Sequence, residues 1–228
     1  EADHGRPAPA HVDVAGLEAN GHFGSAVALN ATGDRLAVGA PYDGGAGNAY
    51  AYSGAVRLFS FGDTNFSSGT LQATLGKGYS GGKNVDVTAL DPSDNFGSAV
   101  ALNAAGDRLA VGALYDTGAG NALGAAGAVH LFTFTDTNFA GGALRGTMGA
   151  GYGKLINQLD NADFFGSAVA LNAAGDRLAV GANYDGGAGN AYLNSGAVRL
   201  FSFSDSNFSG GSLQATLGKG YSGGKNVD

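Results

Sequence analysis

The sequence predicts an all-β protein in which each chain contributes three four-stranded, β-propeller-like blades of a partial ring. Three observations lead to this prediction. A long motif recurs three times along the chain, and each copy contains short apolar stretches separated by glycine-rich turns. No stretch of ten residues shows the amphipathic pattern of a helix. Glycine supplies 42 of the 228 residues, but without the Gly-X-Y period of collagen.

The repeat defines the organisation of the chain. The string Phe-Gly-Ser-Ala-Val-Ala-Leu-Asn begins at Phe23, Phe96 and Phe165, so the copies start 73 and 69 residues apart. Each copy continues with Gly-Asp-Arg-Leu-Ala-Val-Gly-Ala, Tyr-Asp-X-Gly-Ala-Gly-Asn, Gly-Ala-Val-X-Leu-Phe and a closing Gly-Tyr pair. We therefore expect a leader over residues 1–11 and blades over residues 12–85, 86–156 and 157–228.

The first copy shows how one blade is expected to form. Its third apolar stretch alternates, with Val56 and Leu58 on one face and Arg57 and Phe59 on the other. Glycine and asparagine separate the stretches and suit tight turns. A β-solenoid is the alternative architecture, but its coils repeat at about 20–30 residues. The four expected strands are Ser25–Leu29, Arg35–Val38, Ala55–Phe61 and Leu71–Leu75.

Three blades are too few for a closed ring, since propellers have about four to eight. We therefore expect two uncovered sheet faces. Two chains could close a six-blade ring, the blades could belong to a longer parent protein, or chains could join end to end as a filament. Self-association is thus the first partner that the sequence predicts.

The residues at the start, middle and end of the repeat resemble a known family. Phe23–Gly24, Val38–Pro41 and Gly54–Phe59 are similar to the FG-GAP repeat, the blade motif of integrin α-subunit propellers and of many bacterial surface proteins. The resemblance implies a propeller fold, an extracellular or cell-surface location and a role in adhesion. The proline of the motif is present only at Pro41.

One departure from the family concerns calcium. Many FG-GAP repeats carry an Asp-X-Asp-X-Asp-Gly loop between the first two strands, whereas this chain has Asn-Ala-Thr-Gly-Asp at residues 30–34, with a single carboxylate. Calcium takes six to eight oxygen ligands. We therefore expect turn hydrogen bonds here rather than an integrin-type metal site.

The best candidate binding residues lie in the Tyr-Asp-X-Gly-Ala-Gly-Asn loops. Their Asp and Asn side chains offer oxygens to a calcium ion or to sugar hydroxyls, and a purely structural loop is the alternative. The tyrosines could stack on sugars or pack at the blade edge. The candidate ligand or metal residues are Asp43, Asn48, Asp116, Asn121, Asp185 and Asn190, and the candidate stacking residues are Tyr42, Tyr115 and Tyr184.

Composition excludes several function classes. A net charge of -7 with only 12 Lys and Arg disfavours nucleic acid as a partner, and no apolar run approaches the ~20 residues of a membrane span. The chain has no cysteine, and its four histidines do not recur in the repeat, so no catalytic constellation is visible. We expect no enzyme activity and no cofactor other than calcium.

The sequence therefore predicts a non-catalytic, extracellular structural or adhesion protein that assembles through blade–blade contacts. Repetition would offer equal sites whose combined avidity offsets weak single contacts. The alternative is a carbohydrate-binding propeller with one lectin-like site per blade. Glycans or surface proteins are the further partners that these two functions imply.

Overall fold

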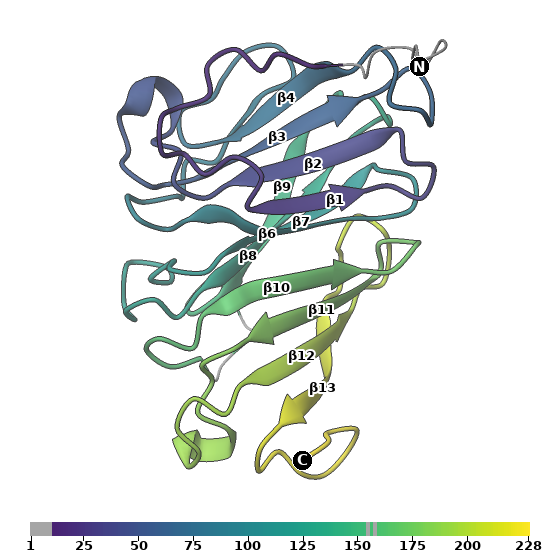
Figure 1. The fold of residues 1–228 in the computed structure, drawn as a ribbon. Coiled ribbons are helices and arrows are strands. Elements are labelled where there is room, and N and C mark those ends of the chain that lie inside the picture. The colour runs from purple at the N-terminus through teal and green to yellow at the C-terminus, as the bar shows by residue number, and fades with distance from the viewer. Residues whose placement is uncertain (1–10, 154–155, 157–158) are drawn as a thin grey trace, which may run out of the picture.

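The computed structural model describes residues 11–153, 156 and 159–228, which form three sheets that follow one another in chain order (Figure 1). The first sheet contains β1 (Ala26–Leu29), β2 (Arg35–Ala40), β3 (Ala55–Ser60), β4 (Thr70–Gly76) and β5 (Val85–Asp86). The second contains β6 (Phe96–Leu102), β7 (Arg108–Ala113), β8 (Ala128–Thr133) and β9 (Ala143–Gly149). The third contains β10 (Phe165–Leu171), β11 (Arg177–Ala182), β12 (Ala197–Ser202) and β13 (Ser212–Gly218).

The predicted fold class is confirmed: the described chain is all-β, with three propeller-like blades. In each blade the first four strands form an antiparallel meander in sequence order. The strands of the first copy begin and end within two residues of the predicted bounds. The only helical pieces in the described part are two three-residue 3₁₀ turns, η1 (Ala46–Asn48) and η2 (Ala188–Asn190).

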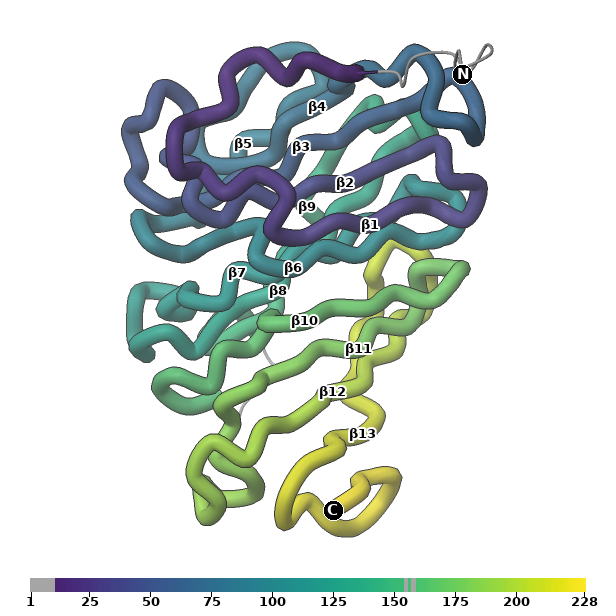
Figure 2. Tube along the Cα trace, viewed as in Figure 1, coloured from purple at the N-terminus to yellow at the C-terminus, as the bar shows by residue number. Residues whose placement is uncertain are grey.

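One strand was not predicted. The connector after the first blade forms the two-residue strand β5, which pairs parallel to β4, with Val85 opposite Leu75. Figure 2 shows the connector beside β4 before the chain enters the second sheet. The connector thus belongs to the first sheet, although its composition alone gives no strand signal.

Each sheet has two unlike faces, because residues directly opposite one another across a ladder share a face. In the first sheet one such row is Ala28, Ala37, Leu58 and Ala73, and this face, which we call the following face, packs on the second sheet. The other face, the preceding face, carries the larger side chains of β1 and β2. The following faces are rich in alanine and glycine, so neighbouring sheets can approach closely.

The two hydrophobic cores lie between sheets rather than within them. The strand β6 packs against β1 and β2, and β10 packs against β6 and β7. The first core joins Val56, Leu58 and Leu75 of the following face to residues of the next preceding face, namely Phe96, Val100, Leu102, Leu109, Val111 and Phe132. The second core repeats this arrangement, with Val129 and Leu131 against Phe165, Leu178, Val180 and Phe201.

The Phe-Gly pair that opens each repeat forms the tightest part of this junction. A Cβ added to Gly39 would lie 2.0 Å from the carbonyl oxygen of Gly97, and one added to Gly54 would lie 2.0 Å from that of Phe96. The backbone N–H of Phe96 also donates to the carbonyl of Ser53 at 3.0 Å. The seam is therefore a backbone-to-backbone contact that only glycine permits.

The same seam closes the second junction. Cβ atoms on Gly112 and Gly127 would lie 2.0 and 2.1 Å from the carbonyl oxygens of Gly166 and Phe165. The N–H of Phe165 donates to the carbonyl of Ala126 at 2.9 Å. The repeated Phe-Gly, Val-Gly-Ala and Gly-Ala-Val pieces are thus the parts of one recurring contact between blades.

This seam predicts that Gly112→Ala destabilises the protein. The added Cβ meets the Gly166 backbone, which cannot swing away as a side chain would, so the two sheets must separate, at a cost of about 1–3 kcal/mol. Urea unfolding followed by far-ultraviolet circular dichroism measures the loss.

The matched control is Gly146→Ala, because no atom of the residues described lies within 4 Å of a Cβ there and the first and third blades carry Ala73 and Ala215 at the same place. We expect its stability to match or slightly exceed that of the wild type. Equal midpoints for Gly112→Ala and Gly146→Ala would contradict the seam.

Candidate functional site

The aspartates of the predicted binding loops point into the protein. Asp43 is buried, and its carboxylate accepts hydrogen bonds from the Gly45 N–H at 2.9 Å and the Tyr79 hydroxyl at 2.8 Å. The Arg57 guanidinium lies 3.0 Å away. The carboxylate therefore links the loop to β3 and to the closing Gly-Tyr pair of the same repeat.

The third blade repeats this cluster. Asp185 accepts from the Gly187 N–H at 2.8 Å and from the Tyr221 hydroxyl at 2.9 Å, and Arg199 lies 2.8 Å away. Burial, with the nearby Asp185 carboxylate, raises the pKa of Tyr221 to about 12. The sequence-based prediction missed that arginines and the closing tyrosines contact the loop aspartates. The sequence did hold a signal for the arginines: in β3 and β12 an arginine lies between a valine and a leucine of an apolar strand, which indicates a charged group close to the core.

The loop asparagines have different partners from the aspartates. The Asn121 amide donates to Asp91 at 3.1 Å, and the Asn190 amide donates to Asp160 at 2.7 Å. These acids lie in the connectors, so each asparagine ties its loop to the segment that enters the same blade. In the first blade the acid that faces the loop asparagine, Asn48, is Glu18. A calcium or sugar role for the loops stays a prediction.

The hairpin turns make the hydrogen bonds that the sequence predicts. The Asn30 side-chain oxygen accepts from the backbone N–H groups of Asp34 and Arg35, at 3.1 and 3.0 Å, while its amide donates to the Asp34 carboxylate at 2.9 Å. Asn103 and Asn172 make the corresponding bonds in the other blades. Asparagine and aspartate here hold the turn between the first two strands.

The middle blade differs because His130 replaces the arginine. Its Nε2 lies 3.9 Å from the Asp116 carboxylate, and its Nδ1 lies 3.1 Å from the Thr147 hydroxyl. Complete burial lowers the pKa of His130 to about 4, so the ring is neutral at pH 7. Burial also raises the pKa of Asp116 to about 6. The middle cluster therefore has no cation to balance its carboxylate.

A second buried carboxylate lies close by. Asp94 accepts a hydrogen bond from the Asp91 N–H at 2.6 Å, and burial, with the charges of Asp116 and Asp91, raises the pKa of Asp94 to about 7. The equivalent Asp163 of the third blade also has a raised pKa through burial, but Arg199 opposes the shift. The first blade has a glycine, Gly21, at this position.

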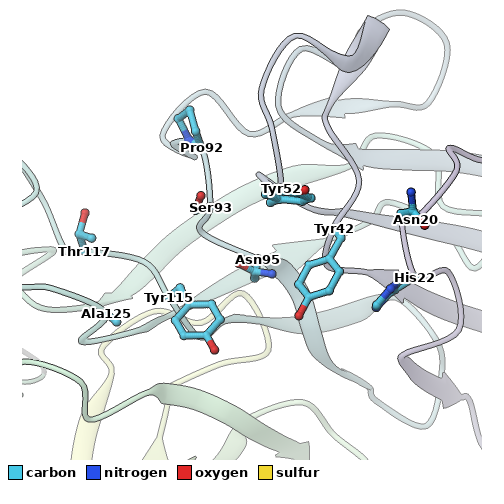
Figure 3. A pocket seen from close by; sticks show the side chains of 10 residues that line it. All are labelled: Asn20, His22, Tyr42, Tyr52, Pro92, Ser93, Asn95, Tyr115, Thr117 and Ala125. Carbon is cyan, nitrogen blue, oxygen red and sulfur yellow. The ribbon is translucent and has the colours of Figure 1, made fainter.

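The candidate stacking tyrosines are all exposed along one edge of the blades. Tyr42 contacts the His22 ring, with centroids 4.4 Å apart. Tyr115 and Tyr184 both contact the Phe164 ring, with ring centroids 5.2 and 5.0 Å apart. The structure thus brings the tyrosines into one row, whereas it turns the neighbouring aspartates inward. A cavity of about 710 Å³ lies between Tyr42 and Tyr115 (Figure 3).

The preceding face of the first sheet is open. Phe23 is 36% exposed, whereas its counterparts Phe96 and Phe165 are fully buried. Val27 and Leu29 are exposed too, although the corresponding residues of β6 are buried. No atom of the described residues lies within 4 Å of a Cβ added to Gly24, so this face lacks the close backbone contact of the internal seams.

The following face of the third sheet is open in the complementary way. Val198 is 38% exposed, whereas its counterparts Val56 and Val129 are fully buried. Gly181 and Gly196 correspond to the seam glycines, but in the described part of the chain no atom lies closer than 3.3 Å to a Cβ added to either. These glycines line a cavity of about 400 Å³ with Ser167, Ala168, Ala182, Asn183, Ser195, Ala197, Val198 and Leu217. We call this cavity the open slot.

A polar contact beside each junction follows the same pattern. Arg35 of the first blade donates to Asn138 of the second at 3.0 Å and also to the carbonyl of Thr137. Arg108 makes the corresponding bond to Ser206 of the third blade. The equivalent Arg177 side chain is 57% exposed, against 12% and 13% for the other two. The third blade therefore also presents an unused interblade arginine.

No group of three or more His, Asp or Glu side chains within residues 11–153, 156 and 159–228 is arranged to hold a metal ion. No helix in this part of the chain is long and apolar enough to cross a bilayer.

Comparison with known proteins gives no family. No family model matches the chain, and no curated protein matches it. Among the solved structures that match is that of Sqt1 from Saccharomyces cerevisiae, with a TM-score of 0.44 and 10% sequence identity. The match covers 88% of this chain, which spans 36% of the Sqt1 chain. A likeness of this size says nothing about what this chain binds.

The buried carboxyl of Asp94 predicts a pH-dependent effect of Asp94→Asn. The folded-state pKa of about 7 exceeds the unfolded value of 3.8, so the contribution of Asp94 to stability falls as pH rises through this window. Asparagine keeps an oxygen for the Asp91 N–H and carries no charge. We expect the variant to gain stability over the wild type from pH 5 to pH 8, by about 1–2 kcal/mol after allowing for partial solvation.

Asp163→Asn is the matched control for this prediction. Because Arg199 opposes the pKa shift there, the gain between pH 5 and pH 8 should be smaller. Thermal unfolding of the two variants and the wild type across this range measures both effects. A difference between Asp94→Asn and the wild type that does not change with pH would refute the assignment.

Proposed function

We propose that the protein is a non-catalytic structural and adhesive repeat module that assembles by docking the open preceding face of one copy onto the open following face of another. One observation carries this proposal. Each part of the internal seam is present once more on an open face, with the Phe-Gly pair on the first sheet and the two receiving glycines on the third, and no described residue covers either. The same proposal includes an extracellular or cell-surface location and calcium as the candidate ligand of the loops.

The internal junctions supply the template for the contact. In the docked pair the Phe23 N–H would meet the carbonyl of Ser195, as Phe96 meets Ser53 and Phe165 meets Ala126. The Gly24 backbone would lie over Gly181, as Gly97 lies over Gly39 and Gly166 over Gly112 at the internal seams.

Side chains around this seam also match. Val27 and Leu29, on the preceding face, would cover Val198, which is the counterpart of Val56. Arg177 would reach residues 64 and 65, which correspond to the two residues that Arg35 contacts, 137 and 138. The new contact would thus bury an exposed apolar face on each copy. It would be made of the same kinds of contact as the two internal junctions.

The contact repeats in one direction, because the two faces are different surfaces of the molecule. Such a heterologous contact closes a ring if the rotation between copies allows it, and otherwise continues as an open chain. Either assembly would place the exposed tyrosine rows of several copies on one surface. Repeated weak adhesion sites would then act together.

Gly181→Ala tests the proposal. In the single chain the new Cβ lies 3.3 Å from the Ala168 Cβ, a contact that a small shift relieves, whereas in the docked copy it would meet the Gly24 backbone, as at the internal seams. We expect the wild type to form dimers or larger assemblies and the variant to dissociate at roughly tenfold or more higher concentration. Light scattering coupled to size-exclusion chromatography over a concentration series measures both.

Gly146→Ala is the control, because it makes the same chemical change away from both open faces and should assemble as the wild type does. Thermal unfolding verifies that both variants are folded. A wild-type chain that stays monomeric at every concentration, or a Gly181→Ala variant that assembles as well as Gly146→Ala, would refute docking through the slot.

A further inference from the structure

The cavity between Tyr42 and Tyr115 has the composition of a site for an uncharged polar ligand. Figure 3 shows the two tyrosine rings on either side of Asn95. No Lys, Arg, Asp or Glu is among the lining residues, which are Asn20, His22, Tyr42, Tyr52, Pro92, Ser93, Asn95, Tyr115, Thr117 and Ala125. Its volume of about 710 Å³ falls within the ~300–1,000 Å³ of small-molecule sites.

The cavity exists at this junction because of one difference between repeats. Position 95 corresponds to position 164, where a phenylalanine fills the space between Tyr115 and Tyr184 with ring contacts of 5.2 and 5.0 Å. Asn95 and Phe164 have nearly the same backbone conformation, with φ of 57° and 54°. Only the side chain differs, so the short amide opens a groove that the aromatic ring closes one blade later.

The amide of Asn95 lacks a partner. The residue is 4% exposed, and its side chain makes no hydrogen bond to any described residue. Its backbone N–H, in contrast, is satisfied by the carbonyl of Tyr52 at 3.1 Å. The side chain of Asn95 lines the cavity, so its amide nitrogen and oxygen are open to hydrogen bonds with a ligand that enters the groove.

We propose that this groove, which we call the Asn95 groove, binds a neutral saccharide. The exposed rings of Tyr42, Tyr52 and Tyr115 offer aromatic surfaces for the apolar C–H face of a sugar ring. The amide of Asn95 and the hydroxyl of Ser93 supply donors and acceptors for sugar hydroxyls, and the hydroxyl of Thr117, which already donates to Asn121, supplies an acceptor. A charged sugar would find no opposite charge on Asp, Glu, Lys or Arg there.

The site is independent of the proposed assembly. It uses the edge of the first two blades, whereas docking uses the open faces of the first and third. It also differs from a lectin with one site per blade, because Phe164 fills the corresponding space at the second junction. The groove therefore predicts one saccharide per chain, bound without calcium.

Binding is first sought on an array of neutral and acidic oligosaccharides with the wild-type chain in the presence of a chelator. The tightest neutral glycan is then titrated by isothermal calorimetry. We expect saturable binding with one sugar per chain. An array with no neutral ligand, or binding that the chelator abolishes, overturns the proposal.

Asn95→Phe is the decisive variant, because it places in the groove the side chain that the same protein uses at position 164. We expect binding at least roughly tenfold weaker, with a melting temperature equal to or above that of the wild type. The reciprocal variant Phe164→Asn opens the second junction, and in folded protein the stoichiometry should rise toward two. Unchanged binding by Asn95→Phe overturns the proposal.

Two further variants separate this site from the assembly. Tyr42→Ala removes one wall of the groove and should weaken binding to the same glycan, with the melting temperature as a check on folding. Gly181→Ala should bind sugar with wild-type affinity even where it no longer assembles. Loss of sugar binding in Gly181→Ala would instead place the site at the contact between copies and overturn the proposal for the Asn95 groove.

Discussion

The structure depends on one contact, the meeting of the Phe-Gly backbone of one blade with two glycines of the blade before it. At this seam the sheets are separated only by backbone atoms, so the alanine-rich following face lies within packing distance of the larger side chains on the next sheet. The phenylalanine is then fully buried, as at Phe96 and Phe165. Both cores of the protein form around this contact. A blade without a neighbour keeps these surfaces exposed, which is the physical basis for proposing assembly.

The polar clusters at the blade edge show how the repeat keeps its shape while its electrostatics change. Asp43 and Asp185 are each balanced by an arginine and capped by a tyrosine hydroxyl. In the middle blade the histidine is neutral and the carboxylate stands without a cation. All three loops nevertheless share one hydrogen bond, from the backbone N–H two residues after the aspartate to its carboxylate. The repeats therefore have the same strand arrangement but differ in the charges of their buried clusters.

Parts of the candidate site could be predicted from the sequence, and parts could not. The exposed tyrosines could be found because they recur beside glycine-rich loops, where side chains commonly reach solvent. The inward direction of Asp43 has no signal in its own loop, since it is decided by Arg57 and Tyr79, which lie far along the chain. The groove at Asn95 is harder to predict, because it exists only where a short side chain lies between two tyrosines. The sequence does not show that these tyrosines are neighbours of Asn95 in space.

The sequence by itself determined the number of repeats, the four strands of each blade and the turns between them. These follow from alternation and from glycine and asparagine at fixed offsets, which act over a few residues. The tertiary structure decided which face of each sheet is covered, which carboxylates are buried, and where Val198, Phe23 and Asn95 are left without partners. Those outcomes depend on residues far apart in the sequence, such as Gly39 and Gly97 across a seam or Asp43 and Tyr79 within a blade, so no local pattern could contain them.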